Sequence, residues 1–433
     1  MAVSFGTALV VLDGAIATIA LPTIARDLGV GSAEAVLVVS VYQLVLVMTL
    51  LPFSALGDRI GHRTLYQYGQ ALFAVATILC FFARSLPFLL VVRAVQALGA
   101  AAALSVSSAL VRAIYPPAQL GRGLGINSVV VSSSAALAPT LGGLILGIAP
   151  WPWVFAIAAP FALLSLLIGR ALPDPEPRDL PYDVLGAVQC AAAFGLTISG
   201  IESAVHGSSP VVSAAIIAAG LLIGKIFVQR ERHRPNPILP VDLLGKPVFA
   251  LSTAGALTAF IASMTLILSL PFRLQHDFGF GPGEIGAMIA PWPLTTMVVA
   301  PLAGVLSDRF PAALLGGIGM TIATVALLLL GFLPAHADYL DVTWRMMLCG
   351  TGFGLFLSPN ARLIIGAAPR DRAASAGGLI STTRLTGQTL GATLVAGLLA
   401  FGASGATPAL VAAGLTVVAG LCSIVRLSPG VRI

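Results

Sequence analysis

Residues 54–64 read SALGDRIGHRT, and this short charged stretch separates two long apolar segments. A related stretch at 304–311, GVLSDRFP, repeats the Asp-Arg pair about 250 residues further along the chain. Arg93 opens a Gly/Ala-rich apolar segment in the first half, and Arg345 opens a similar segment in the second. Matching features at a constant offset indicate that the chain contains two similar halves.

The composition around these stretches is that of a membrane protein. Of the 433 residues, 58% are hydrophobic and only 9% are charged, whereas a soluble domain has about 25% charged residues. A helix that spans a membrane needs about 20 apolar residues, so fourteen spans use roughly 280 residues and leave only short connections. The four cysteines all lie inside apolar stretches, where we expect them to serve as packing residues.

Apolar runs, and the Gly, Pro and charged residues that interrupt them, predict fourteen spans. The predicted spans are 3–24, 35–56, 65–84, 87–110, 124–148, 150–171, 184–203, 210–228, 248–270, 283–304, 313–333, 341–363, 377–400 and 405–425. We therefore expect an all-α integral membrane protein with a six-helix bundle at 1–172, a central helix pair with cytoplasmic flanking loops at 173–247, and a second six-helix bundle at 248–433. Parallel halves around a cavity at the midplane are a recurrent plan among transporters.

Positive charge is distributed unevenly between the two sides of these spans. If the N-terminus is cytoplasmic, seventeen Lys and Arg residues fall on the inner side, and only Arg26, Arg84, Arg273 and Arg345 fall on or near the outer side. Basic residues are retained on the cytoplasmic side, so we expect both termini there. The strong preference for Arg over Lys suggests a bacterial source, and hence the plasma (inner) membrane.

The stretch at 54–64 resembles the signature between the second and third spans of the major facilitator superfamily. Three further segments resemble motifs of its fourteen-span drug:proton antiporter branch, in the first, fourth and fifth spans. These segments are VLDGAIATIALPTIARDLG at 11–29, RAVQALGAAAALS at 93–105 and SSAALAPTLGG at 133–143. The resemblance runs nearly end to end, and it implies the major-facilitator fold and a role in multidrug efflux.

In this family an acid that follows a span forms a charge lock with nearby basic residues at the helix ends. The resemblance assigns the lock to Asp58, Arg59 and Arg63, and in the second half to Asp308 and Arg309. A neighbouring helix N-terminus can stabilise such an anion by about 0.3–1 kcal/mol. The alternative is that these residues only anchor the loop at the lipid headgroups.

Asp13 lies roughly ten residues into the first span, about 15 Å from its start and therefore near the bilayer midplane. An unpaired carboxylate there costs several kcal/mol, so Asp13 should face water, pair with a cation or be protonated. We expect it to be the proton-coupling group. The alternatives are a helix-packing role for Asp13, with coupling at Glu202 or Glu284, or by sodium.

Two further cations lie inside spans beside glutamines on the same helix face: Arg93 with Gln96, and Arg384 with Gln388. Arg93 could instead reach the outer interface, and Arg384 could bridge helices. Small residues of the fifth span allow close packing, and their resemblance favours export; they are Pro139, Gly142 and Gly143. The predicted lining of the substrate cavity is Tyr42, Gln43, Arg93, Gln96, Asn127, Asn360, Arg384 and Gln388, with Phe260 and Trp292 as apolar surfaces.

The hypothesis that follows is proton-driven export of small amphiphilic compounds by alternating access. We expect a monomer whose partners are a small-molecule substrate, protons and the lipid bilayer. The sequence contains no catalytic triad, metal-ligand cluster or phosphate-binding loop, so we expect no enzyme activity, cofactor, metal or nucleic acid. The alternatives are an exporter dedicated to one metabolite or antibiotic, an importer, and a membrane receptor or scaffold that does not transport.

Overall fold

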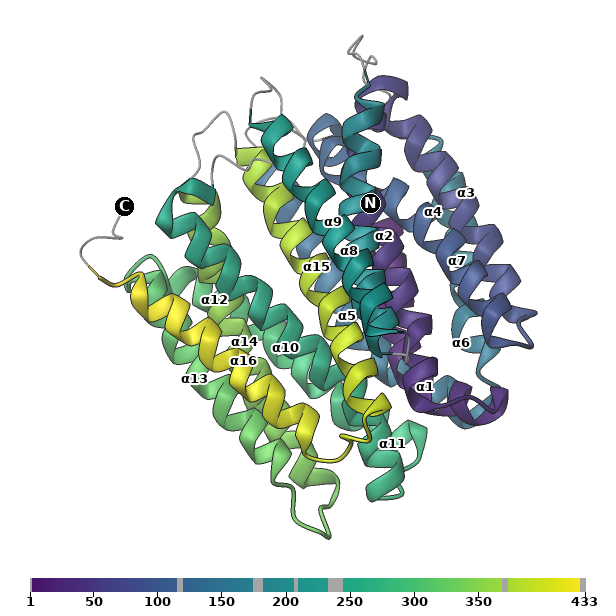
Figure 1. Ribbon diagram of the computed structural model, residues 1–433, viewed down its shortest axis with the longest axis vertical. Coiled ribbons are helices and arrows are strands. Elements are labelled where there is room, and N and C mark those ends of the chain that lie inside the picture. Colours follow the sequence, from purple (N-terminus) through teal and green to yellow (C-terminus); the bar gives the residue numbers. More distant parts are fainter. Residues whose placement is uncertain are drawn as a thin grey trace. The chain divides into compact units, whose positions relative to one another are not determined.

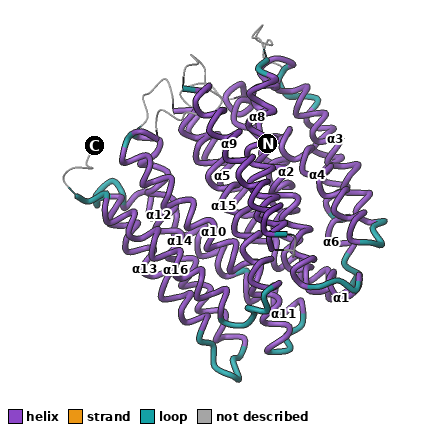
Figure 2. The backbone as a smooth tube through the Cα atoms, viewed as in Figure 1, coloured by secondary structure: helices purple, strands orange, loops and turns teal. Residues whose placement is uncertain are grey.

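The computed structural model of the protein describes residues 2–114, 120–173, 182–205, 209–232, 244–367 and 373–428. The regular structure in these residues is helical, without strands, and short loops join the helices (Figures 1 and 2). The helices are α1 (Ala2–Leu28), α2 (Ser32–Ile60), α3 (His62–Phe81), α4 (Leu86–Ile114), α5 (Leu120–Ile148), α6 (Pro152–Ala156), α7 (Ala158–Gly169), α8 (Val184–Val205), α9 (Pro210–Glu231), α10 (Pro247–Asp277), α11 (Pro282–Ile289), α12 (Pro291–Leu306), α13 (Ala312–Gly331), α14 (Tyr339–Gly366), α15 (Ala373–Ala400) and α16 (Thr407–Val425).

The fourteen predicted spans are confirmed. Twelve segments are long and apolar enough to cross a membrane, and among them α6 with α7, and α11 with α12, each form one span. The helices α5 and α15 have 29 and 28 residues and supply the other two. At 1.5 Å per residue both exceed the roughly 30 Å thickness of the hydrocarbon core.

The two divided spans share a cause that the hydropathy pattern does not reveal. Proline has no N–H, so it cannot donate to the carbonyl four residues earlier, and the helix is weakened there. Because Pro160 has no N–H, the backbone carbonyl of Ala156, the last residue of α6, lacks its helical donor. In the same way, Pro293 leaves the backbone carbonyl of Ile289, the last residue of α11, without its helical donor.

The helices form two compact units, Met1–Phe227 and Val228–Ile433. In the first unit α1 packs on α5, α2 on α4, and α3 on both α4 and α7. In the second unit α10 packs on α15, α12 on α14, and α13 on both α14 and α16. The same packing order therefore recurs in each unit. The predicted separation of residues 173–247 as a central part stays a prediction, and α8 packs against α2 in the first unit.

The repeat extends to individual glycines where two helices approach closely. A Cβ added at Gly99 on α4 would lie 2.5 Å from the backbone nitrogen of Phe73 on α3. A Cβ added at Gly352 on α14 would lie 2.5 Å from the backbone nitrogen of Ala323 on α13. Only glycine fits these positions, since small residues allow membrane helices to pack backbone against backbone.

A second repeated element, at the turns after α1 and α10, went unnoticed in the sequence. Residues 27–34 (DLGVGSAE) and 277–284 (DFGFGPGE) have a glycine at the third position with φ of +65° and +72° respectively. In each turn a glutamate accepts a hydrogen bond from the backbone N–H three residues earlier, at 2.9 Å for Glu34 and 2.8 Å for Glu284. Glu284 is thus an exposed helix cap.

Candidate functional site

Asp13 lies at the centre of a buried polar cluster in the first unit. Arg93 Nη1 donates to Asp13 Oδ2 at 2.6 Å, and Gln96 Nε2 donates to Asp13 Oδ1 at 3.0 Å. Gln96 Nε2 also lies 2.8 Å from the hydroxyl of Thr77 on α3, to which it donates. We call Asp13, Thr77, Arg93 and Gln96 the Asp13 cluster; its members come from α1, α3 and α4.

The Asp13 cluster is sealed from solvent. Asp13 is 1% exposed, and Arg93 and Gln96 are 0% exposed. Both carboxylate oxygens have a donor, and the charge of Asp13 is compensated by Arg93 directly. A buried carboxylate is tolerated under these conditions, because an opposite charge and hydrogen bonds offset its desolvation.

Arg93 has neutral partners besides Asp13. Its guanidinium carbon lies 4.1 Å from the ring centre of Tyr42 and 5.1 Å from that of Phe155. Its Nε donates to the carbonyl of Val38 at 3.4 Å, and its Nη1 donates to Gln96 Oε1 at 2.6 Å. Cations are attracted to the faces of aromatic rings, so this environment accommodates the charge from several directions. Arg93 therefore points into the first unit, and not toward the interface.

Small residues explain how α4 brings these side chains to α1 and α3. Ala97, Ala100 and Ala101 are fully buried beside Gly99, and they leave room for neighbouring backbones. The spacing of Arg93 and Gln96, three residues apart, places both on the side of α4 that faces α1. Thr77 belongs to the cluster as well, although nothing in the pattern of α3 distinguishes it from other buried threonines.

The structure gives fewer polar contacts for the remaining predicted lining residues of the first unit. Gln43 follows Tyr42 on α2 and is buried, and its Oε1 has no hydrogen-bond partner among the described residues. Tyr42 contributes its ring to Arg93, while its hydroxyl is likewise without a partner in the described part of the chain. The side chain of Asn127 lies outside the described residues.

Asn360 belongs to a different buried cluster, within the second unit. Arg426 Nη1 donates to Asn360 Oδ1 and to the hydroxyl of Ser252, each at 2.7 Å. Asn360 Nδ2 donates to the backbone carbonyl of Ser252 at 3.0 Å, and Arg426 Nη2 donates to Ser423 at 2.7 Å. The cluster joins α10, α14 and the end of α16. The sequence did not predict this cluster, because Arg426 is one of the seventeen Lys and Arg residues expected on the inner side and nothing else distinguishes it.

The other predicted lining residues of the second unit are two polar residues on α15 and two aromatic residues at contacts between helices. Arg384 and Gln388 are half-buried on α15. Phe260 packs where α10 meets α15, since a Cβ added at Gly387 would lie 2.6 Å from Phe260 Cβ. Trp292 is buried, with its ring centre 5.1 Å from that of Phe353 on α14. Phe260 and Trp292 thus make helix contacts inside this unit.

The charge locks have partners that the motif alone did not name. Asp58 Oδ1 lies 3.1 Å from His62 Nε2 across the turn at Gly61, whose φ is +97°. Asp308 forms an ion pair with Arg362 of α14, and Arg362 Nη1 donates to Ser307 Oγ at 2.8 Å. A four-residue spacing could have indicated His62, whereas Arg362 is 54 residues from Asp308. Arg59 and Arg309 are exposed, and Arg63 is half-buried.

The predicted packing residues of α5 are buried against α1. Pro139, Gly142 and Gly143 all lie in the interior of the first unit. A Cβ added at Gly142 would lie 3.0 Å from Ile16 Cγ1, which is closer than a normal contact. This close approach accounts for the small residues of the motif, as expected for helix packing in membranes.

Fourteen spans, two repeated units and a membrane-buried carboxylate paired with a guanidinium define a secondary transporter. A sequence profile of the Major Facilitator Superfamily matches residues 3–392 and 251–431. The chain belongs to this superfamily.

Relatives and solved structures agree with this assignment. The chain is 42% identical over 429 residues to the "Uncharacterized transporter YebQ" of Escherichia coli (strain K12), covering 98% of this chain and 93% of that protein. It is 31% identical over 404 residues to the "Multidrug resistance protein Stp" of Mycobacterium tuberculosis (strain CDC 1551 / Oshkosh), covering 92% of this chain and 75% of that one. A solved POT family transporter in complex with 5-aminolevulinic acid has the same fold, with a TM-score of 0.73, 18% identity and coverage of 100% and 96%.

These findings confirm the family and the resemblance to multidrug efflux proteins. The relatives are transporters and not enzymes. The chain is a multi-pass bacterial membrane protein.

Proposed function

We propose that the protein is a proton-coupled exporter of small amphiphilic compounds that works by alternating access. The observation that carries this proposal is the Asp13–Arg93 pair, since it places an ionisable group and its counterion inside the membrane-spanning part of the first unit. Buried charges of this kind are expensive, and in membrane proteins they mark ion and substrate pathways. The name of the relative Stp supports multidrug export.

Protonation of Asp13 provides the coupling step in this scheme. A proton removes the negative charge that holds Arg93, so the ion pair is lost. Arg93 then keeps its bonds to the Gln96 amide oxygen and the Val38 carbonyl, together with the ring face of Tyr42. The first unit therefore retains partners for the cation when the ion pair is lost, so both protonation states of Asp13 can be accommodated.

The substrate contacts and the orientation belong to the same proposal. We assign Tyr42, Gln43, Arg384 and Gln388 to the substrate path, because they are polar or aromatic and lie on predicted cavity helices. As part of this proposal, we place both termini in the cytoplasm. The Asp13 cluster is closed to solvent, so proton exchange requires that the helices around it open a path to water.

Transport by purified protein in proteoliposomes tests the function directly. An imposed pH gradient should drive cationic, neutral or anionic amphiphiles uphill, in the direction opposite to proton flow, and a protonophore should abolish this accumulation. Protein-free liposomes are the control for leak. A sodium gradient that drives transport while a pH gradient does not would contradict proton coupling, and the absence of uphill transport for every class of compound would contradict the function.

The charge locks predict a change in conformational equilibrium without unfolding. Asp58→Asn and Asp308→Asn should each cost less than about 1 kcal/mol of stability, because the Asp58 and Asp308 side chains are 43% and 60% exposed. Each variant should nevertheless change the ratio of inward-open to outward-open protein, measured by side-specific cysteine labelling. Arg170→Gln is the matched control, since it removes an exposed charge from a helix end outside the proposed locks. If ratio and transport rate are unchanged in both Asp variants, these residues only anchor their loops at the headgroups.

A further inference from the structure

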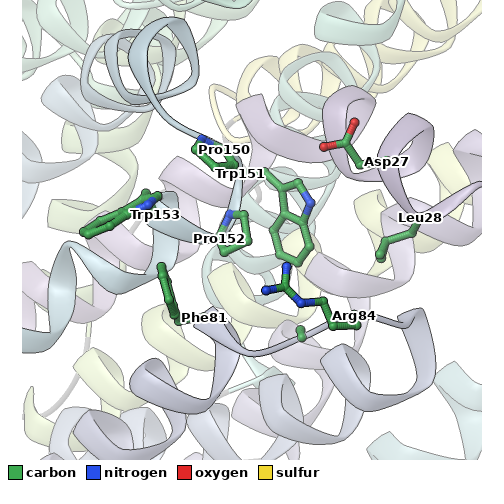
Figure 3. Close-up of a pocket in the computed structure, with 9 residues that line it drawn as sticks. Asp27, Leu28, Phe81, Arg84, Pro150, Trp151, Pro152 and Trp153 are labelled. Carbon is green, nitrogen blue, oxygen red and sulfur yellow. The ribbon is translucent and has the colours of Figure 1, made fainter.

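A pocket of about 450 Å³ lies in the first unit, and none of its lining residues belongs to the Asp13 cluster (Figure 3). It is formed by the end of α1, the connection from α3 to α4, and the connection from α5 to α6. These segments all lie at the helix ends opposite the N-terminal end of α1. By the predicted orientation, the pocket opens at the outer surface of the membrane.

The pocket contains both signs of charge on an aromatic floor. Asp27 and Arg84 line it together with Trp151, which is only 4% exposed. In Figure 3 the Arg84 guanidinium lies beneath the Trp151 ring in this view, and Asp27 lies at the other edge. Arg84 forms no ion pair with the described residues, so its positive charge is free to bind an anion.

Asp27 is also available to a ligand. Its Oδ1 lies 3.5 Å from Nε of Arg26, and both side chains are strongly exposed. Exposed ion pairs contribute little stability, so another cation can replace Arg26 at small cost. The other nearby acid, Glu34, already accepts a hydrogen bond from the backbone N–H of Gly31.

The aromatic residues place this pocket at the depth of the lipid headgroups. Phe82 is 59% exposed and Trp153 is 49% exposed, and the ring of Phe81 packs edge-on against both. An exposed tryptophan beside the end of an apolar span, such as Trp153, is typical of the interface between bilayer and water. A lipid lying against this surface would have its headgroup at the level of Arg84.

We propose that this pocket binds the headgroup of a phospholipid that carries a phosphate and a primary ammonium group, as phosphatidylethanolamine does. The phosphate binds the Arg84 guanidinium, whose planar array of N–H donors suits phosphate oxygens. The ammonium donates to the Asp27 carboxylate, and Trp151 forms the floor. The site does not depend on the proposed transport function.

The internal repeat shows that these residues are not required by the fold. The second unit repeats the turn that contains Asp27, with Asp277 at the equivalent position. At the position equivalent to Arg84, three residues after the end of the third helix of the repeat, it has Pro334. Residues 401–406, the connection that follows α15, contain no tryptophan. The helices of the second unit therefore pack in the same order without an arginine or a tryptophan at the equivalent positions.

Lipid add-back to the delipidated, full-length protein tests the site. Bound lipid per protein is measured by native mass spectrometry with phosphatidylethanolamine, phosphatidylcholine or phosphatidylglycerol. Wild-type protein should prefer phosphatidylethanolamine, because the quaternary ammonium of phosphatidylcholine has no N–H donor and phosphatidylglycerol has no ammonium. Arg84→Gln should weaken binding of phosphatidylethanolamine about tenfold, as expected for the loss of a charge-assisted hydrogen bond.

The comparison variant is Arg26→Gln, which removes the same charge one residue from Asp27 but outside the pocket lining, and it should not weaken lipid binding, because Arg26 competes with the lipid ammonium for Asp27. Asp27→Asn should remove the preference for phosphatidylethanolamine over phosphatidylglycerol. Equal retention of phosphatidylethanolamine by wild-type and Arg84→Gln protein would overturn the proposal. Binding of soluble phosphoethanolamine as tightly as phosphatidylethanolamine would also overturn it, because the ligand would then be a free phosphate compound and not a lipid.

Discussion

An Asp13→Asn variant should reach the membrane in folded form and lose all uphill transport driven by a pH gradient. Asparagine is similar in size to aspartate and keeps one oxygen that can accept from Arg93, but it cannot bind and release a proton. The variant resembles the protonated state of the transport cycle, in which Arg93 relies on Gln96, Val38 and the ring of Tyr42. Transport down a substrate gradient can therefore persist while coupling disappears.

The measurement is substrate accumulation in proteoliposomes with and without an imposed pH gradient, at matched protein content. Asp13→Glu is the control, because it keeps an ionisable carboxyl group and should retain part of the coupled transport with a shifted pH optimum. Wild-type uphill transport by Asp13→Asn would contradict the assignment, and proton coupling would then have to reside at another group such as Glu202.

Arg93→Met should have the largest effect on stability, a loss of about 3–5 kcal/mol, because it leaves the Asp13 carboxylate buried without its counterion. Methionine keeps much of the volume of the arginine stem, so the loss of stability would reflect the missing charge and hydrogen bonds more than a cavity. The destabilisation should shrink as the pH falls, since a protonated carboxyl group carries no charge. Thermal unfolding in detergent at several pH values measures both effects.

The double variant Asp13→Asn/Arg93→Met separates the ion pair from ordinary packing. If the pair is responsible, the double variant should be more stable than Arg93→Met alone, and the double-mutant cycle should show strong coupling between the two positions. Arg384→Met is the matched control for loss of an intramembrane arginine, because Arg384 forms no ion pair with the described residues. Additive effects of the two substitutions would show that Asp13 and Arg93 do not stabilise each other.

Much of the candidate site could be predicted from local sequence features. The depth of Asp13 in the first span follows from counting residues, and the three-residue spacing of Arg93 and Gln96 places both on one side of α4. The partners across helices could not be predicted in this way. Nothing in the sequence connects Asp13 to Thr77 or to the ring of Tyr42, because these contacts depend on how α1, α2, α3 and α4 pack.

The second unit shows the same limit more clearly. Asn360 was predicted to line the cavity, because it is a polar residue inside a span. In the structure it is bonded to Arg426, 66 residues away, in a cluster that also contains Ser252 and Ser423. Hydropathy marks Asn360 as unusual in an apolar segment, but only the packing of α10, α14 and α16 shows what compensates its polarity.

By itself, the sequence determined the class of the protein and the number and approximate positions of its spans. This is possible because each membrane helix satisfies its own backbone hydrogen bonds, so length and apolar composition decide where a span can exist. The tertiary structure decided which buried charges neutralise each other, how Arg362 reaches Asp308, and where Asp27, Arg84 and Trp151 enclose a pocket. Those features depend on the approach of helices that are distant in the chain, and helix packing in a membrane is set by close side-chain fit that hydropathy does not encode.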